Sequence, residues 1–282
     1  MADALVSTVS DTARWVAQYR ADESARPDAI FRDPLAARLA GEQGRAILAS
    51  SPRALRSGWS IVARTKLLDD LIATCVADGC DRVVNLACGF DTRPYRLPLP
   101  PKFSWFEADL PALIDEKERL LAGETPACAL VRERVDLADE GARRAFLARA
   151  SEGAKRTLVV TEGLLGYLDA AVVSGLGRDL AAVPSLRWWG FDLFSPGALA
   201  RIKKMRGHRA APMLGFAPSE GVAFFEALGW RLVEVHSIAR AARRFRRLPL
   251  PLLPAAWIEP DPRRLGTAVW FGLVRLENVA SA

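Results

Sequence analysis

Amphipathic helical patterns alternate with short strand-like runs between residues 61 and 193, and this alternation restricts the fold more than any other feature. Apolar residues recur at helical spacing over 61–78, and a β-branched run follows at 82–86. The same rhythm predicts strands at 103–108, 129–135, 157–161 and 187–193, and helices at 110–122, 139–150 and 169–182, the last capped by Asp169. It indicates an α/β, Rossmann-like, doubly wound sheet with helices on both faces.

Two later stretches, 231–237 and 267–276, complete a predicted seven-stranded, mostly parallel sheet, in which we expect 267–276 to be antiparallel at the edge. We expect residues 1–282 to form a single domain. Residues 1–60 precede the alternation and predict a helical N-terminal cap, whereas 195–218 interrupts it with glycine, proline and basic residues. We expect both segments to cover the ligand-binding edge of the sheet, the second as a lid-like insertion.

Composition excludes several classes of protein. The most apolar run, 248–258, is interrupted by three prolines and cannot span a bilayer as a helix. No basic-then-apolar signal opens the chain. We therefore expect a cytoplasmic protein without a membrane partner, either a monomer or a weak homodimer.

The chain has a formal net charge of +6, and its basic residues concentrate at 201–209 and 240–247. Such clusters attract nucleic acid or an anionic substrate, but no aromatic-interleaved RNA-binding strand accompanies them. We interpret them as solvated surfaces and expect no nucleic-acid partner. The spacing of the four cysteines, with only two histidines in the chain, matches no metal site, so we expect no bound metal.

Acidic residues follow three of the predicted strands. Glu107 and Asp109 end the strand at 103–108, Asp136 follows the next one, and Glu162 follows 157–161. Because ligands bind beyond the carboxyl ends of parallel strands, this placement predicts a binding site.

Asp109 lies twenty residues after Gly89, the spacing at which nucleoside-binding folds place a carboxylate on the ribose hydroxyls. Asp109 is equally suited to capping the helix predicted at 110–122, and both roles are compatible. Glu107 is the second candidate for the ribose.

Arg64 shares the apolar helix face of Leu68 and so needs a partner for its charge. That partner is either the carboxylate of a ligand or an internal acid, and the sequence does not decide between them. The loop at 87–91 has one glycine and no phosphate-binding lysine, which disfavours a nicotinamide dehydrogenase. A ribose acid, an inward arginine and no phosphate chemistry together describe a site for S-adenosylmethionine.

Five blocks of sequence, in order, carry a resemblance to a known family: RTKLLDDLI, VVNLACGFDTRPYRLPLP, FEADLPALIDEK, VDLAD and TEGLLGYL. They resemble the leucine carboxyl methyltransferase-like family, a class I S-adenosylmethionine-dependent group that includes bacterial O-methyltransferases of secondary metabolism. WVAQYRADESARPDAIFRDPLA is similar to the N-terminal segment of the same family, and the likeness extends from about residue 12 to residue 275.

The resemblance implies a set of cofactor contacts. Arg64 would hold the methionyl carboxylate, with Arg20 as a second contact. Asp109 would bind the ribose, and Glu162 would lie near the amino group and the methyl donor. The resemblance also assigns the turn from Ala87 to Gly89 to packing against the cofactor, and Asp136 and Leu137 to the adenine.

Ala87 departs from the family pattern, which has glycine there. Alanine is acceptable if its φ is negative, whereas a positive φ would weaken cofactor binding.

The predicted activity is O-methylation of a small, acidic acceptor, with a carboxylate favoured because it is ionised at neutral pH and needs no general base. Catalysis would then rest on positioning and on excluding water. Tyr167 and His208 are the candidates should a catalytic side chain be used, although we interpret Tyr167 and the end of the strand at 187–193 as walls of the pocket. Arg201, Lys203, Lys204, Arg206 and Arg209 are expected to attract the acidic acceptor. Methylation of a phenol or alcohol, a protein carboxylate or nucleic acid is the alternative, as is a non-catalytic cofactor-binding protein.

Overall fold

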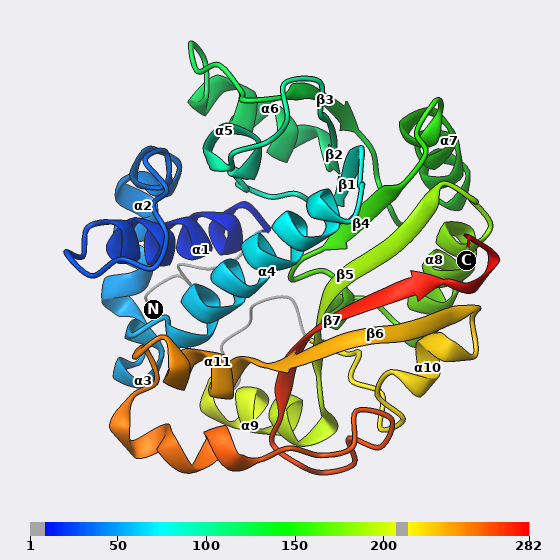
Figure 1. The fold of residues 1–282 in the computed structure, drawn as a ribbon. Helices are drawn as coiled ribbons and strands as arrows, with labels where there is room; N and C mark the ends of the chain where they lie inside the picture. The colour runs from blue at the N-terminus through cyan, green and yellow to red at the C-terminus, as the bar shows by residue number, and fades with distance from the viewer. Residues whose placement is uncertain (1–8, 207–213, 282) are drawn as a thin grey trace.

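A seven-stranded sheet with helices on both faces forms the centre of the protein (Figure 1). The computed structural model describes residues 9–206 and 214–281. The strands are β1 Arg82–Leu86, β2 Ser104–Asp109, β3 Ala129–Arg134, β4 Thr157–Thr161, β5 Leu186–Phe194, β6 Trp230–Ser237 and β7 Phe271–Asn278. Their order is β3-β2-β1-β4-β5-β7-β6, with parallel pairing from β3 to β5 and antiparallel pairing of β7 with both of its neighbours. The predicted Rossmann-like fold and the number of strands are confirmed.

The position of β7 corrects one expectation. The antiparallel strand lies between β5 and β6, one place in from the edge, and β6 is the edge strand. β7 also begins at Phe271, four residues later than predicted, because the preceding residues form a turn and an extended connection. Its central position agrees with its burial, since every residue from Gly272 to Asn278 is buried.

Nine of the helices are α1 Val9–Ser24, α2 Ala36–Ser50, α3 Arg53–Arg56, α4 Trp59–Ala77, α5 Arg93–Arg96, α6 Pro111–Leu120, α7 Glu140–Ser151, α8 Ala170–Ala181 and α9 Pro196–Arg206. The C-terminal part adds α10 Ala223–Glu226, α11 Ile238–Arg244 and the 3-10 segment η2 Leu250–Trp257; the shorter 3-10 turns are η1 Leu165–Tyr167 and η3 Val279–Ser281. The side chain of Asp139 accepts a hydrogen bond from the Ala142 amide at the start of α7, whereas Asp169 makes no such bond at α8. The predicted cap at Asp169 is therefore wrong as a side-chain interaction.

Alternating strand residues supply the two faces of the sheet. Val84 and Val159 pack with the residues of α7 and α8, while Val83 and Leu158 pack on the opposite face with α4 and α11. This period of two is the pattern expected for strands buried on both sides. The two cores hold the carboxyl ends of the parallel strands in a fixed arrangement.

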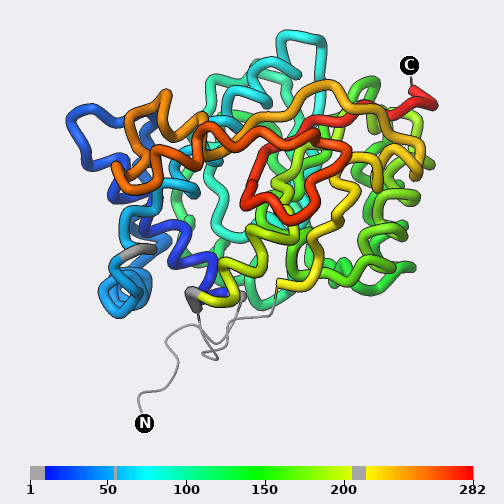
Figure 2. Tube along the Cα trace, turned by 90° about the horizontal axis from the view of Figure 1, so that it is seen from below, coloured from blue at the N-terminus to red at the C-terminus, as the bar shows by residue number. Residues whose placement is uncertain are grey.

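The described part of the N-terminal region consists mainly of helices α1 and α2. Helices α1 and α2 pack together and contact α6 through a third apolar cluster that includes Phe90. At Gly58, where α4 begins, an added Cβ would lie 2.2 Å from the Tyr19 ring, so only glycine allows α1 to approach so closely. The chain near residue 247 lies beside the N-terminal cap in Figure 2, and Arg247 forms an ion pair there with Glu23.

The segment predicted as a lid contains helix α9, and part of it lies outside the described residues. In the part of the chain that the structure describes, no helix is both long and apolar enough to cross a membrane.

Candidate functional site

A cavity of about 860 Å³ opens at the carboxyl ends of the parallel strands. Its wall includes Ala87 after β1, Asp109 at the end of β2, Asp136 after β3, Glu162 after β4 and Asp192 in β5. The strand order reverses between β1 and β4, which is where α/β sheets bind ligands. The acids predicted to meet at one edge do meet there, with Glu107 as the exception.

Asp109 lines the cavity and is held there by two backbone amides. Its Oδ2 accepts a hydrogen bond from the Gly89 amide at 2.7 Å, and its Oδ1 accepts one from the Leu110 amide at 2.8 Å, at the start of α6. Burial raises the pKa of Asp109 from its ordinary value, while the two amide hydrogen bonds oppose that rise. The carboxylate is thus fixed in position on the cavity wall.

Glu107 lies outside the cavity, and the suggestion that it binds a ribose is wrong. Its carboxylate is fully buried, and it accepts hydrogen bonds from Lys117 at 2.9 Å and Arg132 at 2.7 Å. Glu107 and Asp109 are two residues apart on β2, yet Glu107 is enclosed with two cations between the strand and α6.

The turn after β1 combines an unusual backbone with close packing. Ala87 has a φ of +53° and Gly89 a φ of +48°. A left-handed conformation is normal for glycine but unfavourable for alanine. The sequence analysis considered a negative or a positive φ at Ala87, and the structure has the positive value, the less favourable of the two. Ala87 also lines the cavity.

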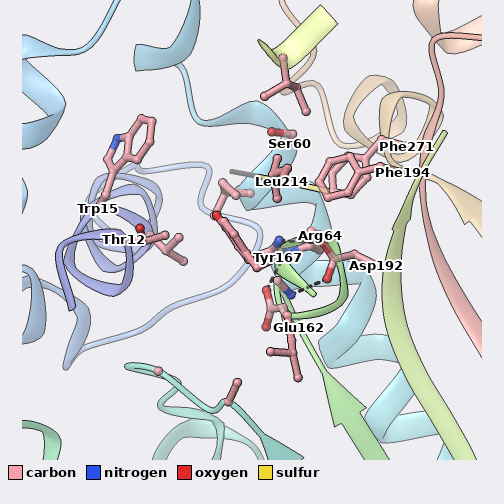
Figure 3. A pocket seen from close by; sticks show the side chains of 18 of the residues that line it. Thr12, Trp15, Ser60, Arg64, Glu162, Tyr167, Asp192, Phe194, Leu214 and Phe271 are labelled. Carbon is pink, nitrogen blue, oxygen red and sulfur yellow. Dashed lines mark hydrogen bonds and ion pairs between the residues drawn. The ribbon is translucent and has the colours of Figure 1, made fainter. Parts of the chain in front are cut away.

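Arg64 has internal partners. Its Nε donates to Glu162 Oε1 at 2.8 Å, and its Nη1 donates to Asp192 Oδ2 at 3.2 Å (Figure 3). Nη2 makes no hydrogen bond to any residue that the structure describes. The guanidinium lines the cavity, so the internal pairing leaves one nitrogen available to a ligand.

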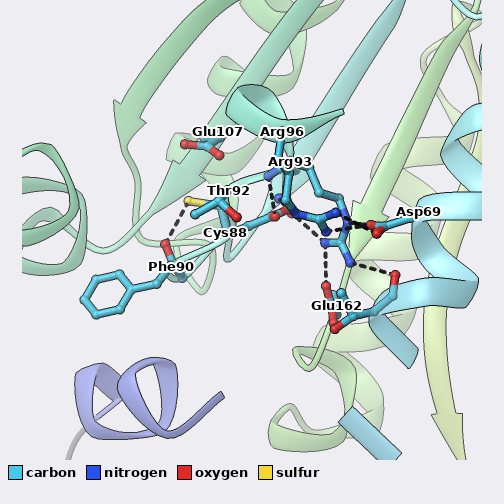
Figure 4. A network of polar contacts seen from close by, with 12 residues as sticks. Asp69, Cys88, Phe90, Thr92, Arg93, Arg96, Glu107 and Glu162 are labelled. Atoms are coloured by element: carbon cyan, nitrogen blue, oxygen red, sulfur yellow. Dashed lines mark hydrogen bonds and ion pairs between the residues drawn. The ribbon is translucent and has the colours of Figure 1, made fainter. Parts of the chain in front are cut away.

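Arg93 is a central residue of the site that the sequence analysis missed. It is buried and donates to Glu162 Oε2 at 2.7 Å, to Asp91 Oδ2 at 3.0 Å and to Asp69 Oδ1 at 2.7 Å (Figure 4). Arg96 binds the same Asp69. The signal available was the arginine two residues after Asp91 in the loop, but nothing in the spacing showed that it points inward.

Asp192 is the second residue that was missed. It is 3% exposed and accepts hydrogen bonds from Arg64 and, at 2.5 Å, from the Gly163 amide. The sequence did place an acid near the end of the strand at 187–193, where it was interpreted only as part of a pocket wall. The argument that ligands bind beyond the carboxyl ends of parallel strands would have made Asp192 a candidate as well.

Glu162 lies between two arginines. Burial alone would raise its pKa, but Arg93 and Arg64 together lower the pKa of Glu162 from 4.5 to about 2. The carboxylate is therefore ionised at neutral pH, and its two oxygens are already engaged.

The side of the cavity away from Asp109 is mainly apolar and aromatic. Phe194 and Phe271 stack with ring centroids 4.3 Å apart, and Leu214 and Tyr167 line the cavity near them, whereas Trp15 lines it from α1 on the other side (Figure 3). Residues of η2 and its flanks add further apolar wall. This half provides space and shape rather than charge.

The remaining predicted site residues divide into three groups. Asp136 and Leu137 line the cavity, with Asp136 exposed. Arg20 also lines it, but is bound to Asp33 at 2.8 Å and to the Phe90 carbonyl at 2.6 Å. His208 lies outside the described residues.

The two basic segments differ in their contacts. Arg201 lines the cavity, Lys203 and Lys204 are exposed in α9, and Arg209 and the side chain of Arg206 are not described. In the second segment, Arg240 pairs with Glu259, Arg247 pairs with Glu23, and Arg243 lies over the Trp257 ring at 4.4 Å.

Comparisons with known proteins identify related sequences and structures. A protein of Frankia alni, provisionally named an S-adenosyl-L-methionine-dependent methyltransferase, is 34% identical over 87% of this chain and 90% of its own. A similarly named protein of Streptomyces coelicolor is 34% identical over 88% and 91%. Among solved structures, a protein of Thermobifida fusca that is described as a methyltransferase superposes with a TM-score of 0.60. The superposition covers 97% of this chain and 95% of that one at 14% sequence identity, and it supports the fold.

The sequence model of the leucine carboxyl methyltransferase family matches residues 13–181, which include Arg64, Asp109 and Glu162. The chain therefore belongs to the leucine carboxyl methyltransferase family and is an S-adenosylmethionine-dependent methyltransferase.

Proposed function

We propose that this methyltransferase forms a methyl ester on the carboxylate of a small, largely apolar molecule. The observation that carries the proposal is the cavity itself, which joins a charged half to an apolar, aromatic half. When bound, S-adenosylmethionine supplies the electrophilic methyl group. The chain's own residues have to bind the two reactants, orient them and keep water out.

The charged half fits the cofactor. The wall offers the fixed carboxylate of Asp109 for a diol and the unused nitrogen of Arg64 for a carboxylate. No lysine lines the cavity among the described residues, in agreement with a ligand that carries no phosphate. Asp109 would hold the ribose, Arg64 the methionyl carboxylate, and Asp136 with Leu137 the adenine.

The apolar half argues for an acceptor that needs no deprotonation. Histidine is absent from the described cavity wall, and Glu162 and Asp192 are both bound to Arg64. A phenol or alcohol requires a base of suitable pKa within reach, whereas a carboxylate is already ionised. Arg201, at the edge of the cavity, would attract such an acid.

Tyr167 and the stacked pair of Phe194 and Phe271 would hold the acceptor by contact. A flat apolar body suits these rings, and its entry removes water from around the reacting oxygen. In this assignment Tyr167 shapes the pocket and does not transfer a proton.

Methylation of a nucleic acid receives less support. Several arginines of the segment 240–247 are engaged with Glu259, Glu23 and the Trp257 ring, so they do not form a free basic stripe. The cavity half available to an acceptor is enclosed by apolar rings, whereas phosphate-rich polymers need cationic walls.

The test uses radiolabelled S-adenosylmethionine and matched acceptors that differ only in carrying a carboxylic acid, a phenol or a primary alcohol. We expect label in the acid series, released as volatile methanol after brief alkali, because esters hydrolyse under conditions that leave methyl ethers intact. Label that resists alkali would refute ester formation while leaving methyl transfer established.

A further inference from the structure

The cavity wall carries more negative than positive charge. Five carboxylates line it among the described residues, against three guanidinium groups: Asp91, Asp109, Asp136, Glu162 and Asp192 against Arg20, Arg64 and Arg201. Part of this negative charge is compensated by Arg93 behind the wall, which pairs with Asp91 and Glu162, so the balance has to be counted over the whole ion-pair network.

One negative charge is left over in the ion-pair network around Arg64. Arg64, Arg93 and Arg96 are its cations, and Asp69, Asp91, Glu162 and Asp192 are its acids. Four carboxylates thus share three guanidinium groups. Glu162 receives two of them, Arg64 at 2.8 Å and Arg93 at 2.7 Å, so its charge is well compensated.

Asp192 is the acid with the least compensation. Its one cationic partner among the described residues is Arg64, at 3.2 Å, and Arg64 is closer to Glu162. Its other contact is the Gly163 amide. Burial raises the pKa of Asp192 in spite of Arg64, which agrees with a carboxylate that lacks a full counter-charge.

Asp192 also occupies the boundary between the two halves of the cavity. In Figure 3 Asp192 lies beside Arg64, and on β5 it precedes Phe194 of the stacked pair by two residues. A methyl group that passes from a donor in the charged half to an acceptor in the apolar half must cross this boundary.

We propose that Asp192 is a specificity-determining residue that favours the positively charged methyl donor over its neutral thioether product. The inference rests on the proposed placement of the cofactor in the charged half. S-adenosylmethionine and S-adenosylhomocysteine share adenosine, carboxylate and ammonium groups, and they differ in one methyl group and one positive charge. A buried carboxylate without a full counter-charge stabilises the sulfonium of the donor but not the neutral thioether of the product. The product therefore binds less tightly and dissociates more easily after methyl transfer.

The test is calorimetric binding of three ligands to the wild type and to Asp192→Asn: S-adenosylmethionine, S-adenosylhomocysteine and sinefungin, which carries an amine in place of the sulfonium. We expect the variant to lose about tenfold in affinity for both cationic ligands relative to the neutral one, which corresponds to about 1.4 kcal/mol. Sinefungin separates charge from the shape of the methyl group, because it has the charge without the sulfonium.

Asp136→Asn is the matched control, since it removes a carboxylate from the same wall at an exposed position; it should change the three affinities by similar factors. Should Asp192→Asn fail to fold, Asp192→Ser keeps an acceptor for the Gly163 amide and serves instead. Equal weakening of all three ligands would overturn the proposal and leave Asp192 as a positioning residue for Arg64. A wild type that binds none of the ligands would instead overturn the placement of the cofactor.

Discussion

Replacing Ala87 by glycine should stabilise the protein, against the usual effect of such a change. The φ of +53° places an alanine in the left-handed region, where an L-residue costs roughly 1–2 kcal/mol. Glycine removes that cost but gains freedom in the unfolded chain, which takes back about 0.4–1 kcal/mol. For Ala87→Gly we therefore expect the free energy of unfolding to rise by about 0.5–1 kcal/mol. For a chain of this size, that raises the midpoint temperature of thermal unfolding by roughly 2 °C.

The assay is equilibrium unfolding in urea combined with scanning calorimetry. Ala122→Gly supplies the control, because Ala122 is exposed in the turn after α6 and has no positive φ. That variant should lose stability through the unfolded-state effect alone. If Ala87→Gly were no more stable than Ala122→Gly, the argument from backbone strain would be refuted.

Calorimetric titration of the same two variants with S-adenosylmethionine tests the expectation that a positive φ at Ala87 weakens cofactor binding. Tighter binding by Ala87→Gly, between about two- and fivefold, would require the bound turn to be more strained than the free turn by about 0.5–1 kcal/mol. A gain in stability without any gain in affinity would show that free and bound proteins are strained alike, and would remove that expectation.

Three further predictions concern the charged residues. Asp109→Asn should weaken S-adenosylmethionine binding by at least about tenfold by calorimetry, because hydrogen bonds to charged groups contribute about 1.5–3 kcal/mol; unchanged affinity would remove Asp109 from the site. Glu107→Gln should instead destabilise the protein by about 3–5 kcal/mol in urea, since it leaves the buried Lys117 and the partly buried Arg132 without a charged partner, and the folded variant should bind S-adenosylmethionine normally. Glu162, whose pKa is lowered to about 2, contributes about 3 kcal/mol to the free energy of unfolding. This contribution is complete above about pH 4.5 and is lost between pH 4.5 and pH 2. Arg93→Met should abolish much of this dependence of stability on pH, and an unaltered pH profile of stability would contradict the pairing of Glu162 with Arg93.

Much of the fold could be predicted because local periodicity and the core agree. The strand from Thr157 to Thr161 is found as predicted, since its residues pack alternately on the two faces. The place of β7 was not predictable in the same way, because strand order depends on how the long connection through α11 and η2 returns to the sheet. Periodicity identifies a strand but does not name its neighbours.

The site was predictable where topology alone decides. Acids at the carboxyl ends of parallel strands had to meet, and Asp109, Asp136 and Glu162 do. Glu107 and Asp109 lie on the same face of β2, because residues two apart in a strand point the same way, so alternation could not separate the two candidates. Glu107 lies farther from the carboxyl end of the strand and is enclosed by Lys117 and Arg132 instead. The inward position of Arg93 depends on the geometry of a loop, which no periodic pattern encodes.

Arg64 has internal ion pairs, and these are compatible with the ligand contact proposed for it. A guanidinium has five N–H donors, and here Nε and Nη1 are used by Glu162 and Asp192 while Nη2 has no described partner. The internal pairs fix the orientation of the side chain before any ligand arrives, so less conformational freedom is lost when a carboxylate binds. A buried cation at an empty wall would be costly, and a fully paired one would have nothing left to offer. The partial pairing of Arg64 avoids both problems, and it leaves Asp192 as the acid whose charge a cationic ligand would complete.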